Sequence, residues 1–151
     1  MNNHKRLIIA SMVLLAGSTA GACGSDDDTS GTASTPTATT KEISGSVEEW
    51  VVQVDATEAP AGDVSFTIDS DGTIGHEFLI VKTDIAPGEI PLDGDHFPED
   101  ADGIEVIDEI GEFAQGTTGS LAVTLEPGSY QLVCNLPGHY SSGMYLGFDV
   151  T

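Results

Sequence analysis

Basic residues are scarce in this sequence. Four lysines and arginines stand against 25 aspartates and glutamates, and the formal net charge of the 151 residues is −21. Two of the four, Lys5 and Arg6, lie near the N-terminus, so a chain cleaved after them keeps only Lys41 and Lys82. Because phosphate groups are bound mainly through Lys and Arg, nucleic acids and anionic lipid headgroups are excluded as partners. The acidic surface either maintains solubility or steers a basic partner toward the protein.

Cysteine is also scarce. The sequence contains two cysteines, Cys23 and Cys134. The first follows a leader-like segment and the second ends a β-rich stretch near the C-terminus, so they have different roles. A disulfide framework is therefore not expected, and each thiol needs its own explanation.

Long hydrophobic runs are absent. The apolar run over residues 7–16 is interrupted only by Ser11 and is too short to span a bilayer. It follows the positive pair Lys5-Arg6, and small residues follow it. This order is typical of an export signal, which we place at residues 1–22.

Residues 18–23 resemble the lipobox of bacterial lipoproteins, in which the Cys becomes the lipidated first residue of the mature chain. Gly21 and Ala22 fit that pattern, whereas Ala20 stands where a branched aliphatic residue is usual. The resemblance implies a lipidated Cys23 that anchors an exported protein to the outer face of the cell membrane. The alternative is an ordinary secretory signal, with Cys23 incidental.

Large apolar residues are missing from residues 24–40, which contain Asp26-Asp-Asp28 and a run of Ser, Thr, Ala, Gly and Pro. Such a segment cannot bury enough surface to offset the entropy of ordering. We therefore interpret residues 23–41 as a lipidated Cys followed by a disordered tether. Seventeen flexible residues have a root-mean-square span of roughly 20–25 Å.

Residues 42–151 carry the pattern of an all-β domain. Short segments of alternating apolar residues are separated by turn signals such as Asp69-Ser-Asp-Gly72 and Pro127-Gly128. Seven or eight strands of this kind predict an all-β Greek-key sandwich or barrel. The expected strands cover residues 50–54, 64–68, 76–81, 104–110, 121–125, 130–134 and 144–150.

The segment between two of these strands, residues 83–103, is a long stretch rich in Pro, Gly, Asp and Glu. Loops of this length in a compact domain are usually functional or hold a short helix. Its acidic residues suggest calcium, yet their spacing does not match an EF-hand loop. We expect a solvated acidic loop.

Residues 134–144 combine three potential metal ligands. Cys134, His139 and Met144 are separated by four residues each, on a stretch rich in turn residues. Two imidazoles and a thiolate with a weak axial Met form the ligand set that selects copper for electron transfer. Taken singly, Cys134 and Met144 are equally well explained as core residues. Their conjunction with a histidine favours a metal site.

The second imidazole must come from another part of the chain. His76 begins a predicted strand and shares its face with Phe78 and Ile80. His96 lies inside the acidic segment, with no Cys or Met nearby, and is a poorer candidate. His4 belongs to the leader.

Three motifs together resemble the cupredoxins, the plastocyanin-like and azurin-like blue copper proteins. They are Gly75-His76-Glu-Phe-Leu-Ile-Val81, Pro127-Gly-Ser-Tyr130 and Cys134-x4-His139-x4-Met144. The spacing is most similar to that of the sulfocyanin-like members. The resemblance covers residues 42–151 and implies a Greek-key β-sandwich with one copper ion bound by His76, Cys134, His139 and Met144.

Glu77 departs from the family pattern. Plastocyanin and azurin commonly carry an Asn after the first His, and that Asn helps to brace the copper loop. A second interpretation makes Glu77 an oxygen ligand, although strand alternation directs it away from the face of His76.

The resulting prediction is a membrane-tethered, monomeric carrier of single electrons, not an enzyme, because no nucleophile or general base is arranged for catalysis. His139 is expected to form the exposed edge through which the electron passes. Leu136, Pro137 and Tyr140 would form an apolar rim for a redox partner, and the acidic surface favours a partner that carries a basic docking face. The alternatives are a copper-binding or delivery protein without redox turnover and a copper-free interaction domain.

Overall fold

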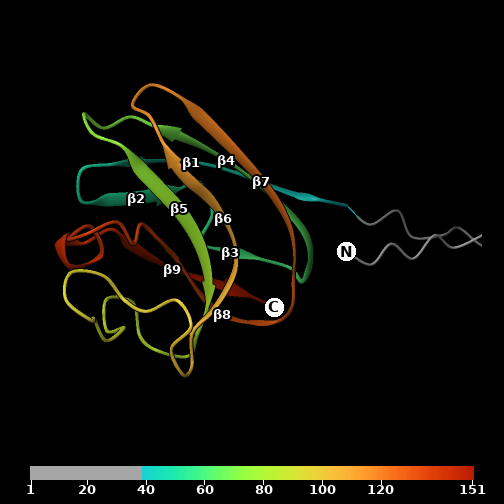
Figure 1. Cartoon of the computed structure of the whole chain (residues 1–151). Coiled ribbons are helices and arrows are strands. Elements are labelled where there is room, and N and C mark those ends of the chain that lie inside the picture. The colour runs from blue at the N-terminus through green and yellow to red at the C-terminus, as the bar shows by residue number, and fades with distance from the viewer. Residues whose placement is uncertain (1–38) are drawn as a thin grey trace, which may run out of the picture. The chain divides into compact units, whose positions relative to one another are not determined.

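The computed structural model describes residues 39–151, which form a sandwich of two β-sheets (Figure 1). This part of the chain contains nine strands and one turn of 3₁₀ helix, η1 (Tyr140–Ser142). The strands are β1 (Lys41–Glu48), β2 (Val51–Val54), β3 (Glu58–Ala59), β4 (Gly62–Ser70), β5 (His76–Lys82), β6 (Glu105–Phe113), β7 (Thr118–Leu125), β8 (Gly128–Val133) and β9 (Tyr145–Val150). The predicted export signal over residues 1–22, the lipidated Cys23 and most of the tether lie outside the described residues.

The predicted all-β sandwich is confirmed, with two strands that the sequence pattern did not reveal. One is β3, which is only two residues long. The other is β1, where Ile43 and Val47 are the only large apolar residues, so no alternation is visible. Gly45 lies in the middle of β1, where a Cβ would clash with the carbonyl oxygen of Gln53 on β2.

The two sheets are connected in Greek-key fashion. The first has the strand order β2-β1-β4-β7, and the second has the order β3-β9-β8-β5-β6. β1 pairs in parallel with β4, and β5 pairs antiparallel with β8, although neither pair is consecutive in the chain. The chain therefore passes repeatedly between the sheets.

The main core lies between the sheets and is centred on Phe66. On β4, Val64, Phe66 and Ile68 are fully buried, as the alternation predicts. The ring centroid of Phe66 lies 5.7 Å from that of Phe78 on β5 and 5.7 Å from that of Phe148 on β9. Phe66 therefore links the two sheets directly.

The outer face of the second sheet is covered by residues 83–103. Ile90 and Phe97 from this segment are buried against Leu79, Val133 and Tyr140. The prediction of a solvated acidic loop is wrong for these two apolar residues, although the carboxylates are exposed. The cover also explains why residues 78–81 of β5 and residues 130–133 of β8 are buried on both faces of the sheet.

Three connections gather at one end of the sandwich (Figure 1). They are the turn between β1 and β2, the loop over residues 71–75 and the ligand loop, which we define as residues 134–144. Within residues 39–151, no helix has the length and apolar character needed to cross a membrane.

Candidate metal centre

His76 is positioned by the start of β5. Alternation along the strand directs its ring into the interior, where it is completely buried. Neither ring nitrogen has a hydrogen-bond partner. Gly72 makes room for the ring, since a Cβ at that position would lie 2.6 Å from Nε2. A buried imidazole without a partner is costly, and a metal ion would satisfy it.

Cys134 directly follows β8 and is completely buried. Its Sγ accepts a hydrogen bond from the backbone N–H of Glu77 at 3.4 Å and lies 3.2 Å from Nδ1 of His139. Burial raises the pKa of the Cys134 thiol to about 11. The thiol is therefore protonated at neutral pH without a metal, and metal binding must release this proton.

His139 is presented by a tight turn of the ligand loop. Its N–H donates to the carbonyl of Leu136 at 2.8 Å, and Gly138 takes a φ of +79°. The ring lies edge-on to His76, with 5.2 Å between centroids. Burial lowers the pKa of both imidazoles, so both favour the neutral form that binds metals.

Three of the four predicted ligands come together. His76, Cys134 and His139 each offer one ligand atom, and these atoms lie within 4.8 Å of one another. Met144 is fully buried beside them: its carbonyl accepts the N–H of Cys134 at 3.1 Å and its N–H donates to the carbonyl of His139 at 3.2 Å. The role of Met144 as axial ligand stays a prediction.

The donor set fits copper. The cluster consists of two imidazoles and one thiol, with a thioether residue adjoining and no carboxylate among its members. Soft sulfur donors combined with imidazole select copper over calcium, magnesium or manganese. The buried, unpartnered nitrogens of His76 are the observation that most directly indicates a metal site.

Glu77 is a brace and not a member of the ligand cluster. Its Oε1 accepts the backbone N–H of Asn135 at 2.7 Å. The bond joins the residue after His76 to the residue after Cys134, so it fixes two ligand-bearing segments to each other. Burial raises the pKa of Glu77.

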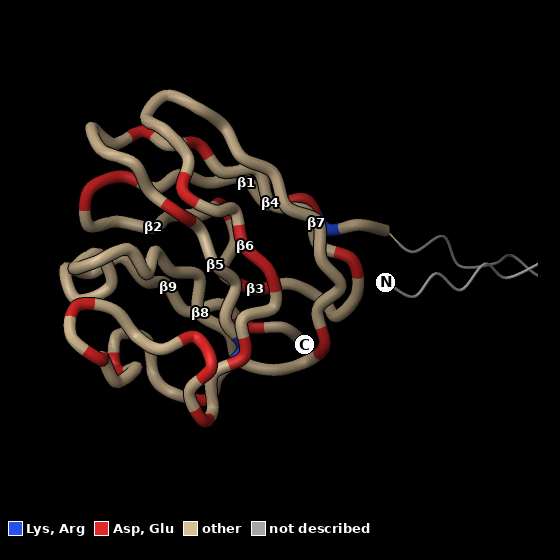
Figure 2. The backbone as a smooth tube through the Cα atoms, viewed as in Figure 1, with Lys and Arg blue, Asp and Glu red and all other residues tan. Residues whose placement is uncertain are grey.

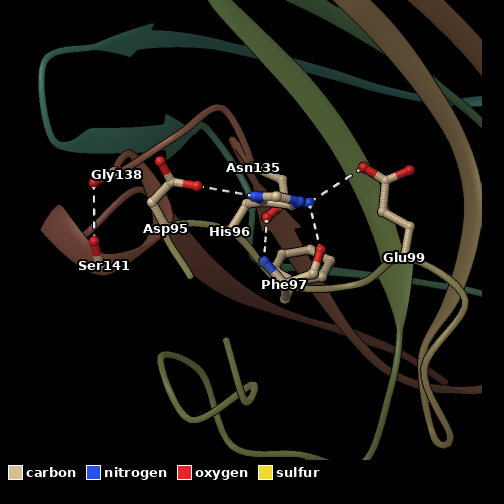
Figure 3. Close-up of polar contacts among 7 residues, drawn as sticks. All are labelled: Asp95, His96, Phe97, Glu99, Asn135, Gly138 and Ser141. Atoms are coloured by element: carbon tan, nitrogen blue, oxygen red, sulfur yellow. Dashed lines mark hydrogen bonds and ion pairs between the residues drawn. The ribbon is translucent and has the colours of Figure 1, made fainter. Parts of the chain in front are cut away.

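Asn135 extends this brace to the long segment over residues 83–103 (Figure 3). Its Oδ1 accepts the N–H of Phe97 at 2.9 Å, and its Nδ2 donates to the Phe97 carbonyl at 2.9 Å and to Oε1 of Glu99 at 3.2 Å. The N–H of Gly138 also donates to the carbonyl of Asp95 at 2.7 Å. The acidic segment thus supports the ligand loop, a role that the sequence analysis missed.

His96 lies outside the cluster. Its side chain is 53% exposed, and its Nδ1 lies 3.0 Å from Oδ1 of Asp95 (Figure 3). The preference for His76 over His96 as the second imidazole agrees with this geometry.

Two expectations about the surface of the site are wrong. His139 is only 8% exposed, and Tyr140 is buried, with its hydroxyl accepting the N–H groups of Gly88 and Ile90. Neither forms an exposed edge. The sequence analysis also missed Trp50, whose ring lies edge-on to His139 with 5.4 Å between centroids. No motif connects residues so far apart in the chain.

Replacing Glu77 tests the brace. Glu77→Ala leaves the N–H of Asn135 without its acceptor, and a buried unsatisfied donor costs about 1–3 kcal/mol. We expect a loss of this size in the free energy of unfolding of the metal-free protein, measured by urea titration. Glu77→Gln keeps an acceptor and should lose less.

The matched control is Glu109→Ala, which removes a nearby exposed carboxylate without touching Asn135. Equal stabilities for Glu77→Ala and Glu109→Ala would show that the brace contributes nothing.

Several known structures share the β-sandwich fold that carries this ligand cluster. One is auracyanin from Roseiflexus castenholzii reduced with dithionite, with 28% identity and a TM-score of 0.52 over 74% of this chain and 96% of that chain. Reduced rusticyanin matches in fold with 22% identity and a TM-score of 0.53, over 74% and 79%. An azurin from Methylomonas sp. strain J matches in fold with 15% identity and a TM-score of 0.53, over 74% and 98%.

Comparisons with protein-family models and with curated protein sequences return no match. The structural matches, together with the ligand cluster, support the cupredoxin family. The resemblance that the sequence motifs indicated is thereby confirmed.

Proposed function

We propose that this chain is a blue copper protein that carries single electrons between redox partners, with one copper ion held by His76, Cys134, His139 and Met144. The observation that carries the proposal is the buried cluster of two imidazoles and a thiol, whose ligand atoms lie within 4.8 Å of one another. When bound, copper supplies a one-electron Cu(II)/Cu(I) couple, which a thiolate and a weak axial Met keep accessible.

The residues around the cluster keep its geometry fixed. Glu77 joins the segment of His76 to that of Cys134, and Asn135 fastens the ligand loop to the covering segment. A rigid cage needs little rearrangement when its charge changes by one electron. The proposed activity is transport and not catalysis, and the reduced states of the auracyanin and rusticyanin structures are examples of one end of such a cycle.

Copper delivery without redox turnover is the rival function. A protein that hands over its metal needs ligands that the recipient can reach, and here His76 and Cys134 are completely buried while His139 is 8% exposed. This burial favours the electron carrier.

A reductive titration of the copper-loaded protein distinguishes these functions. We expect the oxidised protein to show a visible charge-transfer band from copper bound to the Cys134 thiolate. One electron per copper should bleach this band completely, and reoxidation should restore it without loss of metal. Release of copper on reduction would instead indicate delivery, and failure to bind copper at all would indicate an interaction domain.

We also propose that the carrier is exported and tethered by a lipid on Cys23. This residue lies outside the described part of the structure, and support comes from the lipobox-like sequence over residues 18–23.

Cells expressing the full chain should incorporate labelled palmitate into it, and Cys23→Ala should abolish the label and release the protein from the membrane fraction. Cys134→Ala is the control, and it should keep the label. Equal labelling of Cys23→Ala and the unaltered chain would exclude this anchor.

A further inference from the structure

Trp50 has an unusual backbone conformation. Among residues 39–151 it is the only non-glycine residue with a positive φ, at +68°. Bulky side chains disfavour this region, so the conformation persists only where surrounding contacts impose it. Strain of this kind concentrates at functional sites, and the contacts of Trp50 indicate which function it serves.

The neighbouring residue, Glu49, holds the turn on one side. The Oε1 atom of Glu49 accepts three hydrogen bonds from the loop that precedes His76. The donors are the N–H of Thr73 at 2.6 Å, the Oγ1 hydroxyl of Thr73 at 2.7 Å and the N–H of Ile74 at 3.0 Å. These donors, the Thr73 hydroxyl first, lower the pKa of Glu49 to about 2 and keep the carboxylate charged. The turn between β1 and β2 is therefore fastened to the loop over residues 71–75.

The ligand loop contacts the turn on the other side. Gly143 has a φ of +116°, and a Cβ there would lie 3.2 Å from the carbonyl oxygen of Trp50. The indole ring stands nearly perpendicular to the ring of His139, at 85° and 5.4 Å between centroids. The turn is thus held against both segments that supply histidine ligands.

Trp50 connects the mostly buried His139 to the protein surface. His139 is 8% exposed, whereas Trp50 is 46% exposed. A partner that approaches this end of the sandwich can therefore touch the indole directly while having little access to the imidazole. The aromatic pair forms a continuous path from the ligand cluster to solvent.

The surface around Trp50 has the character of a docking patch. Four large hydrophobic residues are exposed within residues 39–151. Trp50 and Ile74 belong to the turn and the loop that Glu49 joins, and Val51 follows Trp50 at the start of β2. The fourth, Leu92, lies in a different loop. Exposed apolar residues that gather on segments held together by hydrogen bonds indicate an interaction site.

The charge distribution specifies the partner. Glu48, Glu49 and Asp71 flank the patch in sequence (Figure 2). The two lysines of residues 39–151 lie at strand ends remote from it: Lys41 begins β1, and Lys82 ends β5, about 20 Å along the strand from its first residue (Figure 2). Acidic residues beside exposed apolar residues on this protein complement a partner that has basic residues beside an apolar centre.

We propose that Trp50 is the contact through which electrons pass between His139 and a redox protein with a basic docking face, and that Glu49 is the residue that positions it. This inference rests on the proposed electron-carrier function. One electron leaves the reduced partner and is taken up at the oxidised centre; no bond forms or breaks, and no proton moves.

The test uses the copper-loaded protein with reduced cytochrome c, a basic haem protein, as the probe. Loss of an interface tryptophan typically costs enough to slow association or raise dissociation about tenfold, so Trp50→Ala should lower the second-order rate constant by about tenfold. The copper–thiolate charge-transfer band should stay unchanged, because Trp50 contacts His139 and not Cys134, and this separates a contact from a structural role. Trp50→Phe should retain part of the rate, and Leu92→Ala, an exposed residue outside the patch, should retain all of it.

The positioning role of Glu49 has its own readout in the metal-free protein. Glu49→Ala should accelerate amide hydrogen exchange at Thr73 and Ile74 in that form. In the copper-loaded protein it should slow electron transfer beyond the effect of Glu48→Ala, which removes the same charge next to the same turn. Rates should fall with ionic strength for cytochrome c and rise for the anionic probe ferrocyanide, because the patch is acidic.

An unchanged rate in Trp50→Ala, or a lower rate accompanied by a changed charge-transfer band, would overturn the proposal. A rate in Glu49→Ala equal to that of Glu48→Ala would overturn the positioning role. If the unaltered protein exchanges no electrons with any probe, the proposed function itself fails, and this result is distinguishable from both.

Discussion

Cys134→Ser is expected to abolish the intense visible charge-transfer absorption of the copper-loaded protein. That absorption arises from a thiolate bound to Cu(II), and Cys134 is the only cysteine in the part of the chain that the structure describes. A serine hydroxyl is a harder donor with a far higher pKa, so it does not replace the thiolate. The two imidazoles remain, and we expect a weakly bound, nearly colourless Cu(II). Absorption spectroscopy after addition of one equivalent of Cu(II) gives the measurement.

Met144→Leu is the companion variant, because it keeps the volume of a fully buried side chain while removing its sulfur. If the thioether is a weak axial ligand, the band should persist in this variant with a shifted reduction potential. A strong band in Cys134→Ser would contradict the ligand assignment. Circular dichroism shows whether Cys134→Ser is folded, and this is checked before the absorption spectra are compared.

Phe66→Ala is expected to lower the free energy of unfolding by about 3–5 kcal/mol, as is usual for deletion of a buried aromatic ring. Phe66 is completely buried and packs against Phe78 and Phe148 on the opposite sheet, so no single sheet can close the cavity. A loss of this size is a large part of the stability of an ordinary domain. Urea unfolding of the metal-free protein measures it.

Thr67→Ala provides the control, since Thr67 is the next residue on β4 and points to solvent. Its effect should lie within about 0.5 kcal/mol, the usual range for surface substitutions. If Phe66→Ala were no more destabilising than Thr67→Ala, the ring would not be the centre of the core between the sheets.

The parts of this structure that depend on local pattern were predictable from the sequence. Alternation of apolar residues located β4, β5, β7, β8 and β9 to within a few residues. The conjunction of thiol, imidazole and thioether in residues 134–144 indicated a copper site, and His76 was identified as the second imidazole because it begins a strand. These inferences required only the geometry of a strand and the chemistry of the ligands.

The surroundings of the site were not predictable, because they depend on contacts between loops. Asn135 is hydrogen-bonded to Phe97, which lies 38 positions before it. Glu49 is hydrogen-bonded to Thr73 and Ile74, which lie 24 and 25 positions after it. Neither contact leaves a periodic signal in the sequence. The same reason explains why His139 was expected to be exposed: nothing in residues 134–144 reveals that Trp50, from the turn between β1 and β2, covers its ring. Glu77 is not the oxygen ligand of the second interpretation, since its carboxylate instead braces the site through the N–H of Asn135.

Titration of the purified metal-free protein with Cu(II), followed by visible absorption, tests the central claim most directly. We predict an intense charge-transfer band that grows linearly and stops at one copper per chain, because His76, Cys134 and His139 form one buried cluster. A weak band without a defined endpoint, or saturation at more than one copper per chain, would contradict a single copper–thiolate site at this end of the sandwich.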